Sequence, residues 1–134
     1  MNVQAVRNMA DAAREAGAVL IHVSSDYVFD GCSYIPYKDG DMRNPQNVYG
    51  RTKADSEKAV EDSGCRYIIF RTSWLYAVEG NNFVKRMIEK TAESSVLNVI
   101  FDQVGTPTFA DELAGLIVQV IDEGMLDRQG IYNY

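Results

Sequence analysis

The chain has 134 residues, 46% of them hydrophobic and 24% charged, which is typical of one globular domain. Its net charge of -6 and the absence of Lys and Arg clusters disfavour nucleic acid or an anionic membrane surface as the main partner. No apolar run approaches the roughly 20 residues of a membrane span, and the N-terminus does not resemble a signal peptide, so we expect a cytoplasmic protein without a membrane partner.

Cysteine and histidine offer little metal chemistry. Cys32 and Cys65 are isolated and lack metal-ligand spacing, so we expect reduced thiols and no metal site. His22, the single histidine, lies inside an apolar run, and we expect it to have neither a catalytic nor a ligand role.

The first third of the chain predicts a helix, a strand and a long loop. Apolar residues recur at helical spacing over residues 3–15, and Gly17 then ends the helix. Residues 18–25 form a short apolar run that ends in two serines, as in a strand buried on both faces. Residues 26–44 have loop composition, and loops of this length are usually functional.

A second helix follows the loop and precedes a second strand. Asn44 or Asn47 can cap this helix, with Pro45 in its first turn, and it should end near Asp62. We expect its charged residues after Lys53 to form a solvated face. Residues 67–73 repeat the pattern of an apolar strand ending in polar groups.

The last third predicts a helix, a strand and a helix. Asn81 can cap a helix that runs to about Ala92 and buries Phe83, Met87 and Ile88. Residues 96–101 read as a third strand. A possible capping box over residues 108–111 opens a helix to about Asp122, whose expected inward side chains are Leu113, Leu116, Ile117, Val120 and Ile121.

This alternation of strands and helices predicts an α/β fold in a single domain over residues 1–134. We expect a partial Rossmann-like, doubly wound parallel sheet with helices on both faces. Ligands of such sheets bind outside the carboxyl ends of the strands. Those ends carry Ser24-Ser25, Thr72-Ser73-Trp74 and Asp102-Gln103.

Tyr49 and Lys53 stand four residues apart in the second predicted helix and therefore share one face. A nearby ammonium favours the phenolate and would make the phenol a better acid/base group at neutral pH. By itself this spacing is more typical of a solvated pair, and Ser24 and Ser25 are equally compatible with ordinary strand-end capping. Together a hydroxyl, a phenol and an ammonium suit protonation of an oxygen at a carbonyl carbon during hydride transfer.

Five segments in order resemble the extended short-chain dehydrogenase/reductase family: residues 24–31, 47–53, 71–76, 81–83 and 102–108. The resemblance implies that Ser25, where the family usually has Thr, binds the C4 carbonyl of the substrate, and that Tyr49 delivers the proton. Lys53 would bind the nicotinamide ribose and lower the pKa of Tyr49. Ser24 and Thr72 would complete the cofactor side, and Asn2 would support a proton relay. The implied substrate side is Trp74, Asn82, Phe83 and Gln103, with Tyr27 and Phe29 shaping the pocket.

The reaction that this resemblance implies is reduction of the 4-keto group of dTDP-4-dehydrorhamnose to dTDP-rhamnose, with NADPH or NADH. Two alternatives stay open at this stage. A non-catalytic regulatory subunit, like the beta subunit of methionine adenosyltransferase, shares residues 24–31 and the Tyr49 stretch, but Arg71-Thr72-Ser73-Trp74 fits the reductase better. A sugar-nucleotide epimerase or dehydratase should carry different residues after the second strand.

One departure from the family concerns the cofactor. None of the ten glycines forms the G-x-x-G-x-x-G turn that receives the pyrophosphate. We therefore expect the chain to be the central part of a reductase about twice as long, with parts of its substrate region at about 74–83 and 102–134, and to be inactive alone. An unpaired sheet edge would favour a homo-oligomer or a complementing chain.

Overall fold

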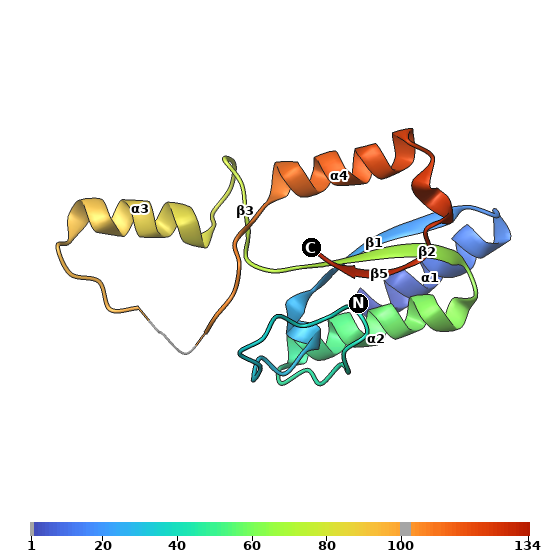
Figure 1. Ribbon diagram of the computed structural model, residues 1–134, viewed down its shortest axis with the longest axis horizontal. Helices are drawn as coiled ribbons and strands as arrows, with labels where there is room; N and C mark the ends of the chain where they lie inside the picture. The colour runs from blue at the N-terminus through green and yellow to red at the C-terminus, as the bar shows by residue number, and fades with distance from the viewer. Residues whose placement is uncertain (1, 100–102) are drawn as a thin grey trace.

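The computed structural model describes residues 2–99 and 103–134, with side chains from Val3 onward. A parallel sheet lies between two layers of helices, and one further helix projects from this body (Figure 1). This α/β architecture is the one predicted from sequence. In chain order the elements are α1 (Asn2–Glu15), β1 (Val19–Ser25), η1 (Asp26–Val28), α2 (Val48–Ser63), β2 (Arg66–Thr72), β3 (Leu75–Tyr76), α3 (Phe83–Glu93), β4 (Thr108–Phe109), α4 (Ala110–Asp122), η2 (Met125–Asp127) and β5 (Gly130–Asn133).

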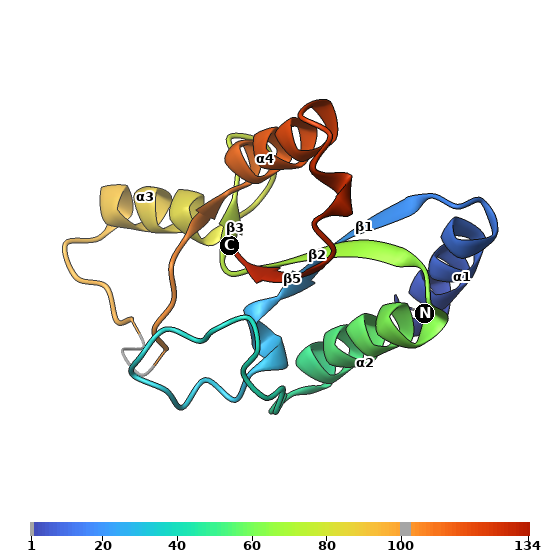
Figure 2. The ribbon, with the colours of Figure 1, turned by 45° about the vertical axis from the view of Figure 1, so that its right-hand side comes forward.

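The main sheet has the strand order β1-β2-β5, and both pairs of neighbours are parallel. The register places Ser25 beside Thr72 and Ile69 beside Ile131. Figure 2 shows α1 and α2 side by side on one face and α4 on the other. All three strands therefore end at the same edge of the sheet, next to the loops that follow them.

Two apolar cores hold these layers together, one on each face of the sheet. Ile69 packs against α1 and α2 together with Val6, Ala10, Val60 and Cys65. Ile68 and Phe70 pack against α4 through Leu113 and Val120. Strand β2 is thus buried on both faces, whereas residues 19–23 of β1 are only half-buried, less than the sequence predicted, because β1 is an edge strand.

The third strand of the sheet was predicted in the wrong place. Residues 96–99 are irregular, and the rest of that predicted strand, 100–101, lies outside the described residues. The third strand is β5, at the end of the chain. The two-residue strands β3 and β4, which form a separate small sheet, were also missed because they are too short to show a pattern.

Helix α2 begins where one of the two candidate caps predicted. The Asn47 side chain accepts a hydrogen bond from the Gly50 amide at 2.7 Å, and Gly64 ends the helix in the left-handed region. Asn44 and Pro45 precede the helix, so neither has its predicted place in the cap or first turn.

Helices α3 and α4 depart from the predictions in their caps and buried sides. Asn82, not Asn81, caps α3. No residue of α3 is buried, and Phe83 and Ile88 are 49% and 64% exposed, because the helix projects from the body. The predicted capping box of α4 is absent, since Thr108 belongs to β4 and Phe109 caps without a side-chain bond. Ile121, which was predicted to face inward, is exposed.

Within the described ranges, no helix combines the length and apolar character that crossing a bilayer requires.

Candidate active site

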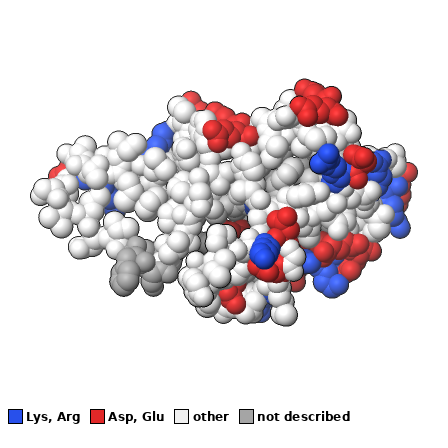
Figure 3. All heavy atoms as spheres, in the orientation of Figure 1, with Lys and Arg blue, Asp and Glu red and all other residues white. Residues whose placement is uncertain are grey.

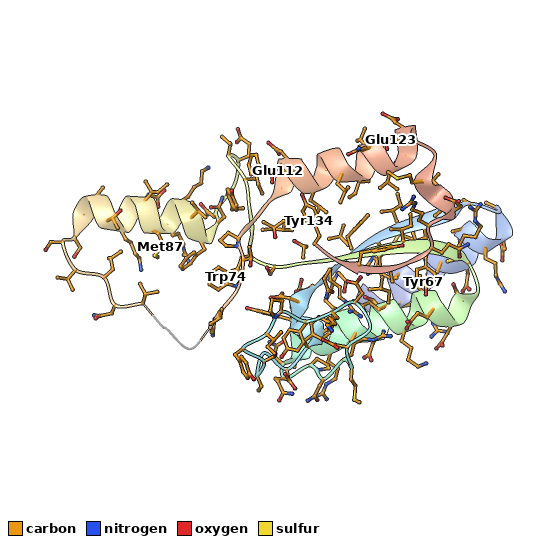
Figure 4. The ribbon with its side chains drawn as sticks, viewed as in Figure 1. Tyr67, Trp74, Met87, Glu112, Glu123 and Tyr134 are labelled. Atoms are coloured by element: carbon orange, nitrogen blue, oxygen red, sulfur yellow. The ribbon has the colours of Figure 1, made fainter. Side chains whose placement is uncertain are left out.

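A cleft of about 1090 Å³ opens at the carboxyl ends of β1, β2 and β5. Figure 4 shows Trp74, Glu112 and Tyr134, all of which line it, around the space between α4, β3 and the end of β5. A smaller, mostly apolar hollow of about 340 Å³ adjoins it and shares Tyr27 and Trp74. In Figure 3 the charged side chains lie mainly over the sheet half of this face, while the part between α3 and the body is mostly uncharged.

Three hydroxyl side chains lie at the ends of β1 and β2. Ser24, Ser25 and Thr72 are all buried, and Ser25 and Thr72 are register partners. Ser25 Oγ donates to Asp26 Oδ1 at 3.0 Å and accepts from the Tyr27 amide at 3.2 Å. Among the described residues, Ser24 Oγ and Thr72 Oγ1 have no hydrogen-bond partner, which is unusual for buried hydroxyls, and Thr72 lines the cleft.

Asp26 is a charged wall residue of the cleft that the sequence analysis did not single out. Burial raises the pKa of its carboxyl, and the hydrogen bond from Ser25 acts in the opposite direction. The carboxylate thus controls the direction in which the Ser25 hydroxyl proton points.

Tyr49 and Lys53 lie on consecutive turns of α2, as predicted. Lys53 Nζ donates to the carbonyl oxygen of Val23 in β1 at 2.6 Å, two residues before Ser25. Burial lowers the pKa of the Lys53 ammonium, and the Glu57 carboxylate opposes that shift. The half-exposed Tyr49 ring meets the Tyr27 ring edge-on, with centroids 5.8 Å apart. The structure therefore brings Tyr49, Lys53 and the Ser25 segment to one edge of the sheet.

Gly50 allows this close approach of α2 to η1. A β-carbon at Gly50 would overlap the carbonyl oxygen of Tyr27 and lie 3.2 Å from Cβ of Pro45. Only glycine lets the backbone beside Tyr49 pack directly on the segment that follows Ser25.

The predicted substrate residues divide into two groups. Trp74, Phe83 and Gln103 all line the smaller hollow, and the rings of Trp74 and Phe83 are 5.5 Å apart. Trp74 has a φ of 43°, uncommon for a bulky residue, and this turns its side chain toward Gly105. Asn82 instead caps α3, with its amide bonded to the Lys85 nitrogen and the Ala77 oxygen. The side chain of Asn2, the predicted relay residue, lies outside the described part of the chain.

The model of one protein family, described as the RmlD substrate binding domain, matches residues 1–134. The chain belongs to this family.

Named relatives of this RmlD domain agree with one another. This chain is 46% identical over 121 residues to dTDP-4-dehydrorhamnose reductase of Salmonella typhimurium. The match covers 90% of this chain and 40% of that protein. The crystal structure of dTDP-4-dehydrorhamnose reductase from Bacillus anthracis in complex with NADP superposes with a TM-score of 0.90 at 37% identity, over 100% of this chain and 47% of that one. The crystal structure of a dTDP-4-dehydrorhamnose reductase ortholog from Clostridium acetobutylicum superposes with a TM-score of 0.89 at 42% identity. That match covers 100% of this chain and 46% of the other. The chain thus spans less than half the length of these relatives.

A buried ion-pair network that was not predicted from sequence lies beside the candidate active site of this RmlD domain. Glu57 was predicted to lie on a solvated face of α2, but its side chain is fully buried and paired with Arg71 on β2. Arg43 approaches the same carboxylate at 3.4 Å. One signal was available: Glu57 lies four residues after Lys53 and eight after Tyr49, on the same helix face.

His22 lies on β1, and its Nε2 atom is 3.2 Å from Ser56 Oγ on α2. Burial lowers its pKa to about 4, the Lys53 ammonium adds to the shift, and Glu57 opposes it. The unfolded chain, with a pKa of 6.5, then binds the proton more tightly than the folded one. Stability is therefore fully present above pH 6.5 and falls as the pH drops toward about 4.

We expect the free energy of unfolding to fall by about 1–2 kcal/mol between pH 7 and pH 4 through His22, after allowance for its partial exposure. Urea unfolding at both values should show a smaller loss for His22→Gln than for the wild type. Equal losses in the two proteins would contradict this assignment.

Proposed function

We propose that the protein containing this domain reduces the 4-keto group of dTDP-4-dehydrorhamnose, with NADPH or NADH as reductant. The observation that carries the proposal is the placement of Ser25, Tyr49 and Lys53 on adjoining elements at the carboxyl edge of a parallel sheet. The reductases named above support the choice of reaction, since one of them is 46% identical to this chain.

The proposed proton donor is the Tyr49 phenol, which transfers its proton to the oxygen at C4 as negative charge develops there. Ser25 donates a hydrogen bond to the same oxygen, in exchange for its bond to Asp26. Lys53, one turn after Tyr49 on the same face of α2, is fixed on the Val23 carbonyl. The reduced nicotinamide supplies the hydride.

On the cofactor side we propose Ser24, Thr72, Tyr49 and Lys53. The buried hydroxyls of Ser24 and Thr72 support this, because they have no hydrogen-bond partner among the described residues. Both oxygens are closed to solvent in this structure, so bonding to a ribose hydroxyl requires a shift of the side chains around them.

On the substrate side we propose Trp74, Phe83 and Gln103, which together line the smaller hollow. Two aromatic rings and an amide suit a ligand with an apolar face and hydroxyl edges, such as a 6-deoxysugar. We withdraw Asn82 from this set, because both ends of its amide are bonded within the protein.

The test is a spectrophotometric assay of the full-length protein. We expect NADPH absorbance to fall when dTDP-4-dehydrorhamnose is added and to stay constant with dTDP-glucose, which has no keto group. If NADPH is consumed with neither dTDP-4-dehydrorhamnose nor dTDP-glucose, and the protein instead interconverts sugar epimers, the epimerase alternative is favoured.

We also propose that residues 1–134, produced alone, self-associate through the outer edge of β1. In the described part of the chain β1 pairs only with β2, so its other edge exposes hydrogen-bonding backbone. Sedimentation velocity at micromolar concentration should show a dimer or larger species. A sharp monomer peak would exclude this mode of association.

For the location we propose the cytoplasm. The free thiol of Cys32 is exposed to solvent, and such thiols persist in reducing compartments.

A further inference from the structure

The Arg71 side chain, buried at the end of β2, binds groups from two other parts of the chain. Its Nε and Nη2 atoms donate to the two carboxylate oxygens of Glu57 on α2, at 3.0 and 2.8 Å. Its Nη1 atom donates to the carbonyl oxygen of Asp39 in the long loop, at 3.0 Å. One guanidinium thus connects β2 with both α2 and the loop over residues 29–47.

The α2 side of this connection carries the proposed acid/base pair. Glu57 lies one turn after Lys53 and two turns after Tyr49, and its side chain is fully buried. Arg43, near the end of the loop, donates from its Nη2 atom to both carboxylate oxygens of Glu61, at 2.9 and 2.7 Å. Two arginines and two glutamates therefore hold this end of the loop against α2.

The loop side of the connection forms a wall of the large cleft. The Arg71 guanidinium lies 4.9 Å from the centroid of the Phe29 ring, which stacks on Tyr37 at 4.3 Å. Asn133 of β5 donates to the Asp39 carboxylate and to the Tyr37 carbonyl, at 2.6 and 2.9 Å. Phe29, Tyr37, Arg71 and Asn133 all line the cleft.

We propose that Arg71 is a positioning residue that holds the cleft wall over residues 29–41 in a fixed place relative to the helix bearing Tyr49 and Lys53. Its three donor atoms bond two partners from a side chain anchored on the sheet: Nε and Nη2 bond the Glu57 carboxylate, and Nη1 bonds the loop backbone at Asp39. Tyr27, whose ring meets that of Tyr49, lines the same cleft, so a sugar nucleotide resting on the wall then lies in one arrangement relative to the helix that carries the acid/base pair. The kinetic part of this inference depends on the proposed function, whereas the structural part does not.

The variant that tests the inference is Arg71→Lys, which keeps a positive charge beside Glu57 but loses the planar fork and therefore the bond to Asp39. In the full-length protein we expect backbone amides over residues 30–41 to exchange hydrogen at least about tenfold faster, with α1 and α4 unchanged. We expect the KM for the sugar nucleotide to rise about tenfold, as would follow from a wall that is correctly placed only about a tenth of the time. The KM for NADPH should stay within about twofold.

Arg66→Lys is the matched control, because Arg66 begins the same strand and donates to the Leu126 carbonyl on the exposed surface. It should change neither the loop exchange nor the KM for the sugar nucleotide. Phe29→Leu is a second variant that removes the ring beneath Arg71 and leaves the Glu57 pair intact. It should speed hydrogen exchange over residues 30–41 and raise the KM for the sugar nucleotide, both by less than Arg71→Lys does. If Arg71→Lys does not fold, Phe29→Leu tests the inference in its place.

Unchanged loop exchange in the variants, or faster exchange in α4 as much as in the loop, would overturn the inference, because Arg71 would then serve stability alone. A fall in kcat of about tenfold with an unchanged KM for the sugar nucleotide would also overturn the inference. If the wild type does not reduce the sugar nucleotide at all, the proposed function fails. The hydrogen-exchange comparison then still decides whether Arg71 fixes the wall.

Discussion

Replacing Tyr49 with phenylalanine in the full-length protein is expected to lower kcat for reduction of the keto sugar by about 10²–10⁴-fold, the usual contribution of a positioned general acid. The change removes one hydroxyl from a half-exposed ring, and the ring itself can keep its edge-on contact with Tyr27. NADPH affinity and thermal stability should therefore change little. Steady-state kinetics with calorimetric titration of NADPH separate these effects.

Tyr67→Phe is the control for the loss of a tyrosine hydroxyl. Tyr67 lies at the opposite end of β2 from Trp74 and packs against the α1/α2 core (Figure 4). This variant should keep the wild-type kcat. Equal rates for Tyr49→Phe and the wild type would remove Tyr49 from the proton-transfer step.

Gly50→Ala should destabilise the fold by about 2–4 kcal/mol and reduce activity at the same time. The added methyl group has no room, because it would overlap the backbone carbonyl of Tyr27. The first turn of α2 must then move away from η1, and Tyr49 moves with it. Urea unfolding measures the first effect and the NADPH assay the second.

Gly115→Ala supplies a matched control on α4. Gly115 is also a helical glycine, but nothing lies within 4 Å of a β-carbon there. Alanine should stabilise the protein by about 0.5–1 kcal/mol, since it lowers the entropy cost of forming the helix. If Gly50→Ala were as harmless as Gly115→Ala, the close packing of α2 on η1 would not matter for the site.

The sequence predicted those features that depend on neighbouring residues. The Asn47 cap, one of two candidates, and the shared face of Tyr49 and Lys53 follow from local geometry, and the structure shows both. The buried strand β2 was found for the same reason, since its apolar run lies within seven residues.

Features that depend on distant partners were missed. Glu57 is buried only because Arg71, fourteen residues later, reaches it from β2. The amphipathic pattern of α3 predicted a buried side, but a pattern does not show that a partner surface is present. Strand β5 has four residues, and its place beside β2 follows from the right-handed return of α4 across the sheet, which no local signal encodes.

The most direct test of the account is the fate of the hydride in the full-length protein. With NADPH deuterated at nicotinamide C4 on the transferred face and dTDP-4-dehydrorhamnose as substrate, NMR of the product should show deuterium at C4 of the rhamnose ring. One deuterium should appear for each NADPH consumed, at a rate that falls strongly in Tyr49→Phe. Absence of deuterium from C4, or turnover without NADPH consumption, would contradict the proposed reductase function.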